Sequence, residues 1–210
     1  MIRLYGMIDS GNCYKPRLLL AKLGRPFVHV ETSSRDGSTR TPAYLAKNEN
    51  GKVPLLELED GRFLAESNAM LLYLAEGTRF LPTDAYERAL VYQWLFFEQY
   101  SHEPLIAVRR SLVTYPERAA QVTPERMAAL LEGGNKALGV MEAQLARTPF
   151  LVGDAMTVAD IALYAYTHDA HVGGYELGRF PAVAAWLARV AADPGHVALD
   201  WKPANRTSFP

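Results

Sequence analysis

The sequence predicts an α/β domain with a mixed four-stranded sheet, followed by a domain built only of helices. Short β-prone runs alternate with helical stretches through the first part of the chain. After Leu81-Pro82 the strand signals stop, and only helical stretches follow. This order is typical of an α/β domain joined to an all-helical one. We expect boundaries at 1–77 for the α/β domain, 78–85 for a linker and 86–210 for the helical domain.

Each element of the first domain has its own local signal. A β-prone run at 2–5 ends at Gly6. The first helix should begin near Asn12 or Cys13, because Pro16 lacks an amide proton and fits best in the first turn of a helix. The other expected elements are strands at 27–31, 53–58 and 62–65, the last two joined by the turn-forming Asp60-Gly61, and helices at 42–46 and from Ser67 onward.

The second domain is expected to contain helices at 84–115, 123–146, 157–169 and 180–193. The clearest signal lies at the start of the third helix. Thr157 and Asp160 stand three residues apart, as in a capping box with Asp in place of the usual Glu. Met156 and Ile161 are spaced to close a hydrophobic staple across that turn, so the helix should begin there and bury one face.

Composition narrows the classes of function. The chain has 22 Lys and Arg against 23 Asp and Glu, and this balance argues against a nucleic acid or an anionic membrane as the main partner. One cysteine excludes an internal disulfide framework and a zinc site made of several thiolates. No apolar run approaches the roughly 18 residues of a membrane span, and the first residues turn polar too soon for a signal peptide. We expect a cytoplasmic protein without a metal.

Three short motifs point to one end of the α/β domain. Residues 10–13, Ser-Gly-Asn-Cys, stand between the first strand and the first helix, where helix amides and the positive end of the dipole face a ligand. Val53-Pro54 opens the third strand, a position that also suits a cis peptide bond, and leaves the valine backbone able to pair with an extended peptide. Glu66-Ser67 opens the next helix and offers further amides to a carboxylate.

Together with Asn-Glu-Asn-Gly-Lys-Val-Pro at 48–54 and the capped turn at 157–160, these motifs make the chain resemble the cytosolic glutathione transferases. The resemblance is to bacterial members near the serine-type classes, and it spans nearly the whole chain except the tail. It implies a thioredoxin-like first domain that holds glutathione as a co-substrate.

The resemblance also assigns a role to each motif. Val53, before Pro54, would pair through its backbone with the cysteinyl part of the tripeptide. Ser67 would hold the γ-glutamyl carboxylate, and Glu66 would lie near the amine. The glycine carboxylate would meet Lys52 or Lys15, because this chain has Gly51 where some classes carry a basic or amide side chain.

Such a site must keep the glutathione sulfur ionised. A free thiol with a pKa near 8.5 is mostly protonated at neutral pH, and lowering that pKa by about two units takes about 2.7 kcal/mol. A hydroxyl donor contributes about 1.5–3 kcal/mol, and a helix N-terminus adds about 0.3–1 kcal/mol. Ser10 and the first helix therefore suffice, without a metal or a general base.

Ser10 is the first candidate for the thiolate donor, since serine-type members place their hydroxyl there. Asn12 is the second, because it stands where cysteine-type members have their cysteine. Tyr5 or main-chain amides alone are the remaining alternatives. Cys13 fills the second position of a Cys-x-x-Cys pattern whose first position is Ser10, so we expect a small core side chain rather than a redox group.

The long aromatic helix from 84 onward is the expected wall for a small electrophile. Tyr100, His102 and Arg109 are its candidate contacts, and Glu98 stands four residues before His102, where a carboxylate could orient the imidazole. By resemblance we expect a homodimer that conjugates glutathione in detoxification, with no nucleic acid or membrane partner. The alternatives are a glutathione-dependent peroxidase, reductase or lyase using the same site, and a non-catalytic binding module.

Overall fold

The computed structural model describes residues 1–209 and divides the chain into two compact units. The first unit contains residues 1–76 together with the segment from Pro194 onward, and the second contains Gly77–Asp193. The expected boundary of the helical domain at 210 is therefore wrong. The chain leaves the first unit, forms the helical unit and then returns to the first.

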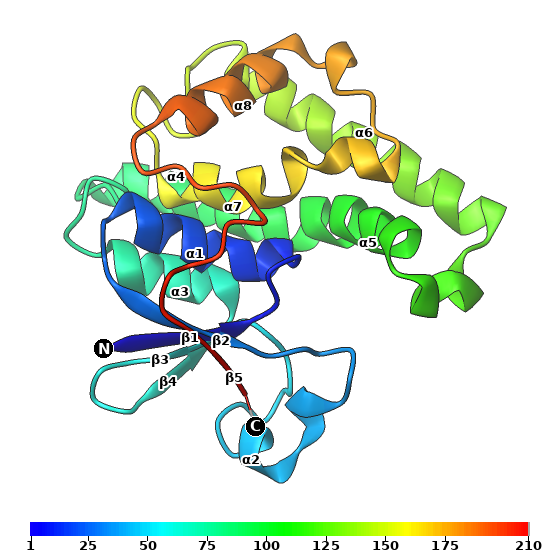
Figure 1. The fold of residues 1–210 in the computed structure, drawn as a ribbon. Coiled ribbons are helices and arrows are strands. Elements are labelled where there is room, and N and C mark those ends of the chain that lie inside the picture. The colour runs from blue at the N-terminus through cyan, green and yellow to red at the C-terminus, as the bar shows by residue number, and fades with distance from the viewer. Residues whose placement is uncertain (210) are drawn as a thin grey trace. The chain divides into compact units, whose positions relative to one another are not determined.

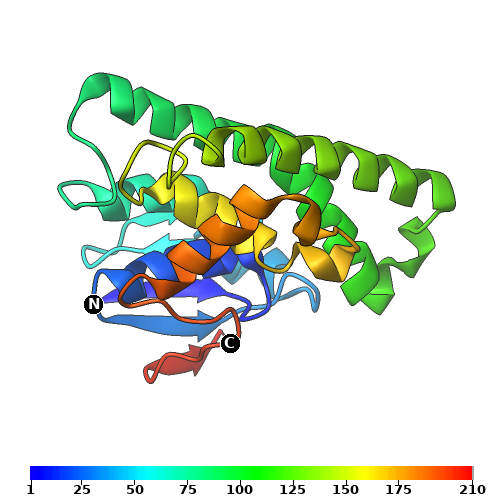
Figure 2. The same cartoon turned by 90° about the horizontal axis from the view of Figure 1, so that it is seen from above.

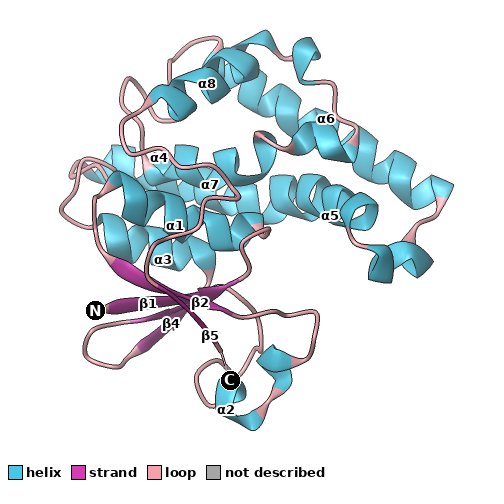
Figure 3. Ribbon diagram, viewed as in Figure 1, coloured by secondary structure: helices cyan, strands magenta, loops and turns pink. Residues whose placement is uncertain are grey.

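The first unit is built on a mixed sheet of five strands in the order β4-β3-β1-β2-β5 (Figures 1 and 3). The pairs β1–β2 and β2–β5 are parallel, whereas β1–β3 and β3–β4 are antiparallel. The expected sheet had four strands, and the fifth is an addition from the tail. The strands are β1 (Ile2–Gly6), β2 (Phe27–Glu31), β3 (Leu55–Glu57), β4 (Phe63–Ala65) and β5 (Arg206–Ser208).

Three helices accompany this sheet: α1 (Gly11–Lys22), α2 (Pro42–Leu45) and α3 (Ser67–Ala75). Helices α1 and α3 pack together on one side of the sheet, and α2 lies on the other (Figure 1). α1 begins at Gly11, slightly earlier than expected, so Pro16 falls inside the helix rather than in its first turn. The missing amide of Pro16 is tolerated because the rest of this helix buries most of its side chains.

The second unit contains the helices α4 (Ala85–Phe97), α5 (Glu103–Thr114), α6 (Pro124–Leu145), α7 (Val158–Thr167) and α8 (Pro181–Ala192). The long helix expected at 84–115 is α4 and α5 joined by a π-helical segment, Glu98–His102. Pro104 explains the interruption, since it cannot donate the regular hydrogen bond to Tyr100, and the Glu103 amide instead reaches back to the Glu98 carbonyl. α6 packs against α5 and the π-helical segment (Figure 2).

The capping box at the start of α7 is present as expected. Asp160 is fully buried and accepts hydrogen bonds from the Thr157 amide at 2.8 Å, the Leu151 amide at 2.9 Å and Trp186 Nε1 at 2.9 Å. One carboxylate thus joins the turn before α7, the helix itself and α8. Among residues 1–209, no helix is both long enough and apolar enough to cross a membrane.

Candidate functional site

Ser10 occupies the N-cap of α1, between β1 and the helix. Its backbone is extended, and its hydroxyl oxygen accepts a hydrogen bond from the Cys13 amide at 3.4 Å. A hydroxyl that accepts in this way still carries its own proton, so it can donate to another group. Ser10 is half-buried and stands at the positive end of the α1 dipole. The position can therefore supply both a donor and a favourable field to an anion.

Cys13 lies in the first turn of α1 and is completely buried. Burial raises the pKa of its thiol, and the neighbouring Ser10 offsets this only in part. Its sulfur packs so closely on Gly6 that a methyl group at Gly6 would lie 2.7 Å from it. The structure agrees with the expectation of a small core side chain, because a buried thiol with a raised pKa is a poor nucleophile.

The starts of α1 and α3 meet through a group of polar side chains. The Ser67 hydroxyl donates to Asn12 Oδ1 at 3.3 Å, which joins the first of the three expected motifs to the third. Lys15 is fully buried, and its ammonium group donates to Ser67 Oγ at 3.3 Å and to Asn68 Oδ1 at 3.4 Å. Lys15 therefore lies at the Ser67 end of the site. The sequence offers Lys15 as a candidate for the glycine carboxylate and Ser67 for the γ-glutamyl carboxylate. These two ligand groups lie at opposite ends of the tripeptide, so the two expectations conflict for side chains that are bonded to each other.

Glu66, the residue before α3, has a positive φ of 66° and is the one non-glycine residue with positive φ in the described chain. A positive φ of this kind costs on the order of 1–3 kcal/mol for a residue with a Cβ and is found where the surroundings require it. Here it turns the chain from β4 into α3 and leaves the amides at the helix start unblocked by a capping side chain. The sequence motif gave no sign of this strain.

The loop before β3 holds its backbone in a defined position. The peptide bond between Val53 and Pro54 is cis, as expected. The carbonyl oxygen of Lys52 accepts two hydrogen bonds, from the Tyr44 hydroxyl at 2.8 Å and from Asn48 Nδ2 at 2.9 Å. These bonds fix the backbone directly before Val53, while the Lys52 side chain is exposed.

Arg40 is a basic residue at this loop that the sequence interpretation did not single out. Its Nη1 donates to the Asn50 carbonyl at 3.2 Å. Gly51 has a positive φ of 60°, and a Cβ at that position would lie 2.7 Å from Arg40 Nη1. The guanidinium therefore fills the space that a side chain at position 51 would take. Gly51 stands where some classes carry a basic or amide side chain. Its lack of a side chain was the sequence signal that another residue, such as Arg40, would have to supply the positive charge.

Tyr5 is less suited to act on a thiol than Ser10. Its side chain is buried, and its hydroxyl donates to the Glu57 carboxylate. Burial together with Glu57 raises the pKa of Tyr5 to about 12. A phenol that is bonded to a carboxylate and hard to ionise has little capacity left for an anion, so the structure argues against this alternative.

The three candidate contacts in the second unit have different environments. Tyr100 is 89% exposed. His102 is fully buried, with Nε2 at 2.8 Å from the Thr167 hydroxyl. Arg109 donates to the carbonyls of Gly173 and Met127, and so ties α5 to two other segments of this unit. These contacts give His102 and Arg109 a role in packing, and contact of the three residues with an electrophile stays a prediction.

Comparison with known proteins supports the resemblance to the glutathione transferases. Residues 4–79 match the family model described as the glutathione S-transferase N-terminal domain, and residues 124–189 match the C-terminal domain. A crystal structure of a glutathione S-transferase from Pseudomonas fluorescens is 51% identical, with a TM-score of 0.91, covering 94% of this chain and 98% of that one. A theta class glutathione S-transferase from Xanthomonas axonopodis, solved with glutathione bound, is 29% identical, with a TM-score of 0.85 and coverage of 94% and 98%. The glutathione S-transferase-like protein LUC7 of a Fusarium species is 33% identical, over 89% of this chain and 87% of its own. These matches confirm the thioredoxin-like first unit and the helical second unit.

Proposed function

Because the chain belongs to the glutathione S-transferase family, we propose that its first unit binds glutathione and ionises the thiol for attack on a small electrophile. The observation that carries this proposal is the hydrogen bond between Ser67 and Asn12. It brings the N-termini of α1 and α3, each with a serine hydroxyl, to one place. Two helix N-termini and two hydroxyl groups favour a ligand with more than one negative group.

The γ-glutamyl end of glutathione has a counterpart at the start of α3. Its carboxylate would bind Ser67 and the amides that follow, and the buried Lys15 ammonium behind Ser67 adds positive charge. Its amine would lie near the Glu66 carboxylate. The buried Lys15 ammonium lies beside the positive end of the α3 dipole, which is unfavourable. A carboxylate bound at Ser67 would offset this repulsion.

The rest of the tripeptide would lie along the loop before β3. The Val53 backbone, held by the bonds on the Lys52 carbonyl, would pair with the cysteinyl residue. The glycine carboxylate would meet Arg40, whose guanidinium lies at Gly51, together with the exposed Lys52 side chain. Arg40 takes the place that Lys15 had in the sequence interpretation.

The Ser10 hydroxyl would donate its hydrogen bond to the glutathione sulfur. The thiol loses its proton to solvent, and the anion is stabilised by this bond and by the α1 N-terminus. The thiolate then attacks the electrophilic carbon. A new C–S bond forms, and the leaving group, such as a halide, departs with its electron pair. Asn12 would hold Ser67 in place and is the second candidate for the sulfur.

Three further properties follow from family membership. We expect a two-fold homodimer, a cytoplasmic location and a role in removing reactive electrophiles. These three expectations come from the resemblance to the glutathione transferases and are proposals for this chain. Size-exclusion chromatography with light scattering would measure the oligomeric state.

The test is glutathione-dependent conjugation of a reactive aryl halide, with the thiol pKa of the complex followed by ultraviolet difference absorbance. We expect Ser10→Ala to raise that pKa by about one to two units, since each unit corresponds to about 1.4 kcal/mol, and to lower the rate at neutral pH about 10- to 100-fold. Thr123→Ala is the matched control, because it also removes an N-cap hydroxyl, that of α6.

Each contrary result identifies an alternative. An unchanged rate in Ser10→Ala would transfer the role to Asn12, to be tested with Asn12→Ala. Reduction of peroxides or disulfides without conjugation would indicate one of the redox alternatives on the same site. Failure to bind glutathione at millimolar concentration would leave only the non-catalytic module.

A further inference from the structure

The segment 194–209, which we call the C-terminal strap, is bonded to the first unit along most of its length. The Tyr14 hydroxyl donates to the Val197 carbonyl at 2.5 Å. The amide of His29 donates to the Asn205 carbonyl at 2.9 Å, and β5 then pairs with β2. These bonds attach the strap to the first unit, where it covers the outer edge of β2 (Figure 1).

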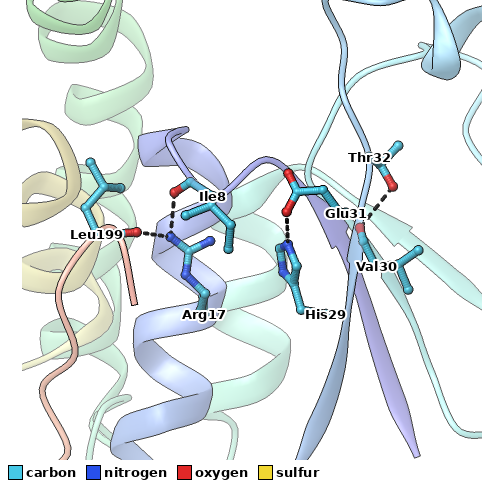
Figure 4. A network of polar contacts seen from close by, with 7 residues as sticks. All are labelled: Ile8, Arg17, His29, Val30, Glu31, Thr32 and Leu199. Carbon is cyan, nitrogen blue, oxygen red and sulfur yellow. Dashed lines mark hydrogen bonds and ion pairs between the residues drawn. The ribbon is translucent and has the colours of Figure 1, made fainter. Parts of the chain in front are cut away.

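Arg17 connects the strap to the loop that carries Ser10. The guanidinium is fully buried, and its Nη2 donates to the Ile8 carbonyl at 2.8 Å and to the Leu199 carbonyl at 2.6 Å (Figure 4). Its Nε and Nη1 have no hydrogen-bond partner among the described residues, so these two carbonyls are important to a buried cation. Ile8 stands two residues before Ser10. Leu199 therefore helps to fix the start of the loop that presents the hydroxyl.

The nearby His29 side chain bonds to Glu31 and not to the strap carbonyl that Arg17 holds. Its Nε2 lies 3.2 Å from the Glu31 carboxylate (Figure 4). Burial, together with the charge on Arg17, lowers the pKa of His29 and so favours the neutral imidazole. Arg17 is then the charged group that holds the strap at this point.

Phe209 connects the strap to the loop before β3. Its amide donates to the Glu31 carbonyl at 2.9 Å. Its ring lies edge-on to Tyr44 at 5.5 Å and to Tyr5 at 6.0 Å between ring centres. The Tyr44 hydroxyl in turn donates to the Lys52 carbonyl, and Val53 packs on the same cluster. The phenylalanine therefore supports the side chain that positions the Val53 backbone.

We infer that the C-terminal strap is a positioning element of the glutathione site, acting through Arg17 on the Ser10 loop and through Phe209 and Tyr44 on Val53. This inference rests on the proposed function. The contacts that carry this inference run from the strap to Arg17 and Tyr44, so we assign the strap an indirect role. Its effect is to hold two loops that are far apart in the sequence at the spacing the tripeptide requires.

The test compares two aromatic residues of the strap. Phe209→Ala removes the ring that supports Tyr44, whereas Trp201→Ala removes a ring that packs near Phe27, at the start of β2, at 6.5 Å between centres. Both variants should lower the Tm. Only Phe209→Ala should weaken glutathione binding in isothermal titration, by roughly tenfold, because misplacement of a binding group is costly. Phe209→Leu should restore most of the affinity.

A chain that ends at Ala204 separates the two connections. It lacks Phe209 and β5 but keeps Leu199, the partner of Arg17. We expect glutathione affinity to fall as in Phe209→Ala, while the thiol pKa of the complex stays at the wild-type value. In Arg17→Gln we expect the opposite pattern. The thiol pKa of the complex should rise, and glutathione affinity should change less than in Phe209→Ala.

The outcomes distinguish this inference from the proposed function. If folded Phe209→Ala and the shortened chain, as judged by circular dichroism, bind glutathione with wild-type affinity, the strap is only structural and the inference is wrong. If Trp201→Ala weakens binding as much as Phe209→Ala, the effect is general destabilisation and the inference is also wrong. If the wild-type protein does not bind glutathione, the proposed function itself fails.

Discussion

Ser10 and Cys13 stand three positions apart at the start of α1, and their surroundings give them different chemistry. Ser10 is half-buried at the helix end, whereas Cys13 is packed on Gly6 with a raised pKa. Neither residue type indicates this difference by itself, since serine is also a common N-cap and cysteine a common nucleophile. The difference in burial makes Ser10 a candidate hydrogen-bond donor and Cys13 a core side chain.

Glu66 illustrates backbone strain at a single residue. Both Glu66→Ala and Glu66→Gly remove the carboxylate, so both should weaken glutathione binding. Only glycine adopts a φ of 66° without a Cβ clash. We expect the glycine variant to be more stable than the alanine variant by about 1 kcal/mol in urea unfolding. Equal stabilities would show that the surroundings do not force this conformation on Glu66.

Tyr5 provides a pH prediction. Its pKa rises from 10.0 to about 12 in the folded protein, so folding favours the protonated phenol. The contribution of Tyr5 to stability is fully present below pH 10 and is lost as the pH rises from 10 to 12. The unfolding free energy of the wild type should fall more steeply over this range than that of Tyr5→Phe. Tyr86→Phe, which changes an exposed tyrosine, is the control variant.

The helices show how single residues define an element. The expectation of one long helix at 84–115 was correct in extent, but Pro104 introduces the π-helical segment. Proline is also common in the first turn of a new helix. Pro104 alone therefore does not show whether the chain starts a separate helix or continues through a π-helical segment. Glu98 and His102, four residues apart in this segment, are both fully buried.

The capping box at the start of α7 gives a testable prediction about stability. Asp160→Ala should lower the unfolding free energy by about 3–5 kcal/mol, because it leaves several buried donors without an acceptor. Trp186→Phe removes one of these donors and should cost less. Asp154→Ala, at an exposed turn nearby, is the control. Urea unfolding measures all three, and a loss below 1 kcal/mol in Asp160→Ala would contradict the role of the carboxylate.

At the scale of the whole molecule, the chain closes its first unit with its last residues. β5 pairs with β2 across most of the sequence, so this pairing closes a long loop and carries a large closure entropy. The first unit is thus not a segment that ends at residue 77. It depends on residues that follow the entire helical unit.

Hydrogen exchange tests this closure. In a chain that ends at Ala204, the His29 amide loses its acceptor on Asn205 and should exchange at least about tenfold faster. The Thr32 amide, which donates to the Gly6 carbonyl, should keep its protection and serves as the internal control. Unchanged exchange at His29 would show that β5 does not protect the sheet edge.

Much of the candidate site could be predicted because its signals are local. Pro54, the Glu66-Ser67 pair and the Ser10 turn each act through the backbone of their own neighbours, and the structure places all three motifs in one unit. The positions of Lys15 and Arg40 could not be predicted in this way. A long cationic side chain reaches several ångströms, and its end point depends on which helix or turn packs beside it.

By itself the sequence determined the order of strands and helices, the capping box of α7 and the three motifs, because caps, prolines and apolar spacing act over a few residues. Only the tertiary structure decided that the tail forms β5, that Arg17 joins Ile8 to Leu199, and that Phe209 lies against Tyr44. The physical reason is that β5 is a short exposed strand held by backbone hydrogen bonds to a distant edge. Backbone bonds of this kind leave no pattern in the side chains, so they become visible only when the two segments are folded together.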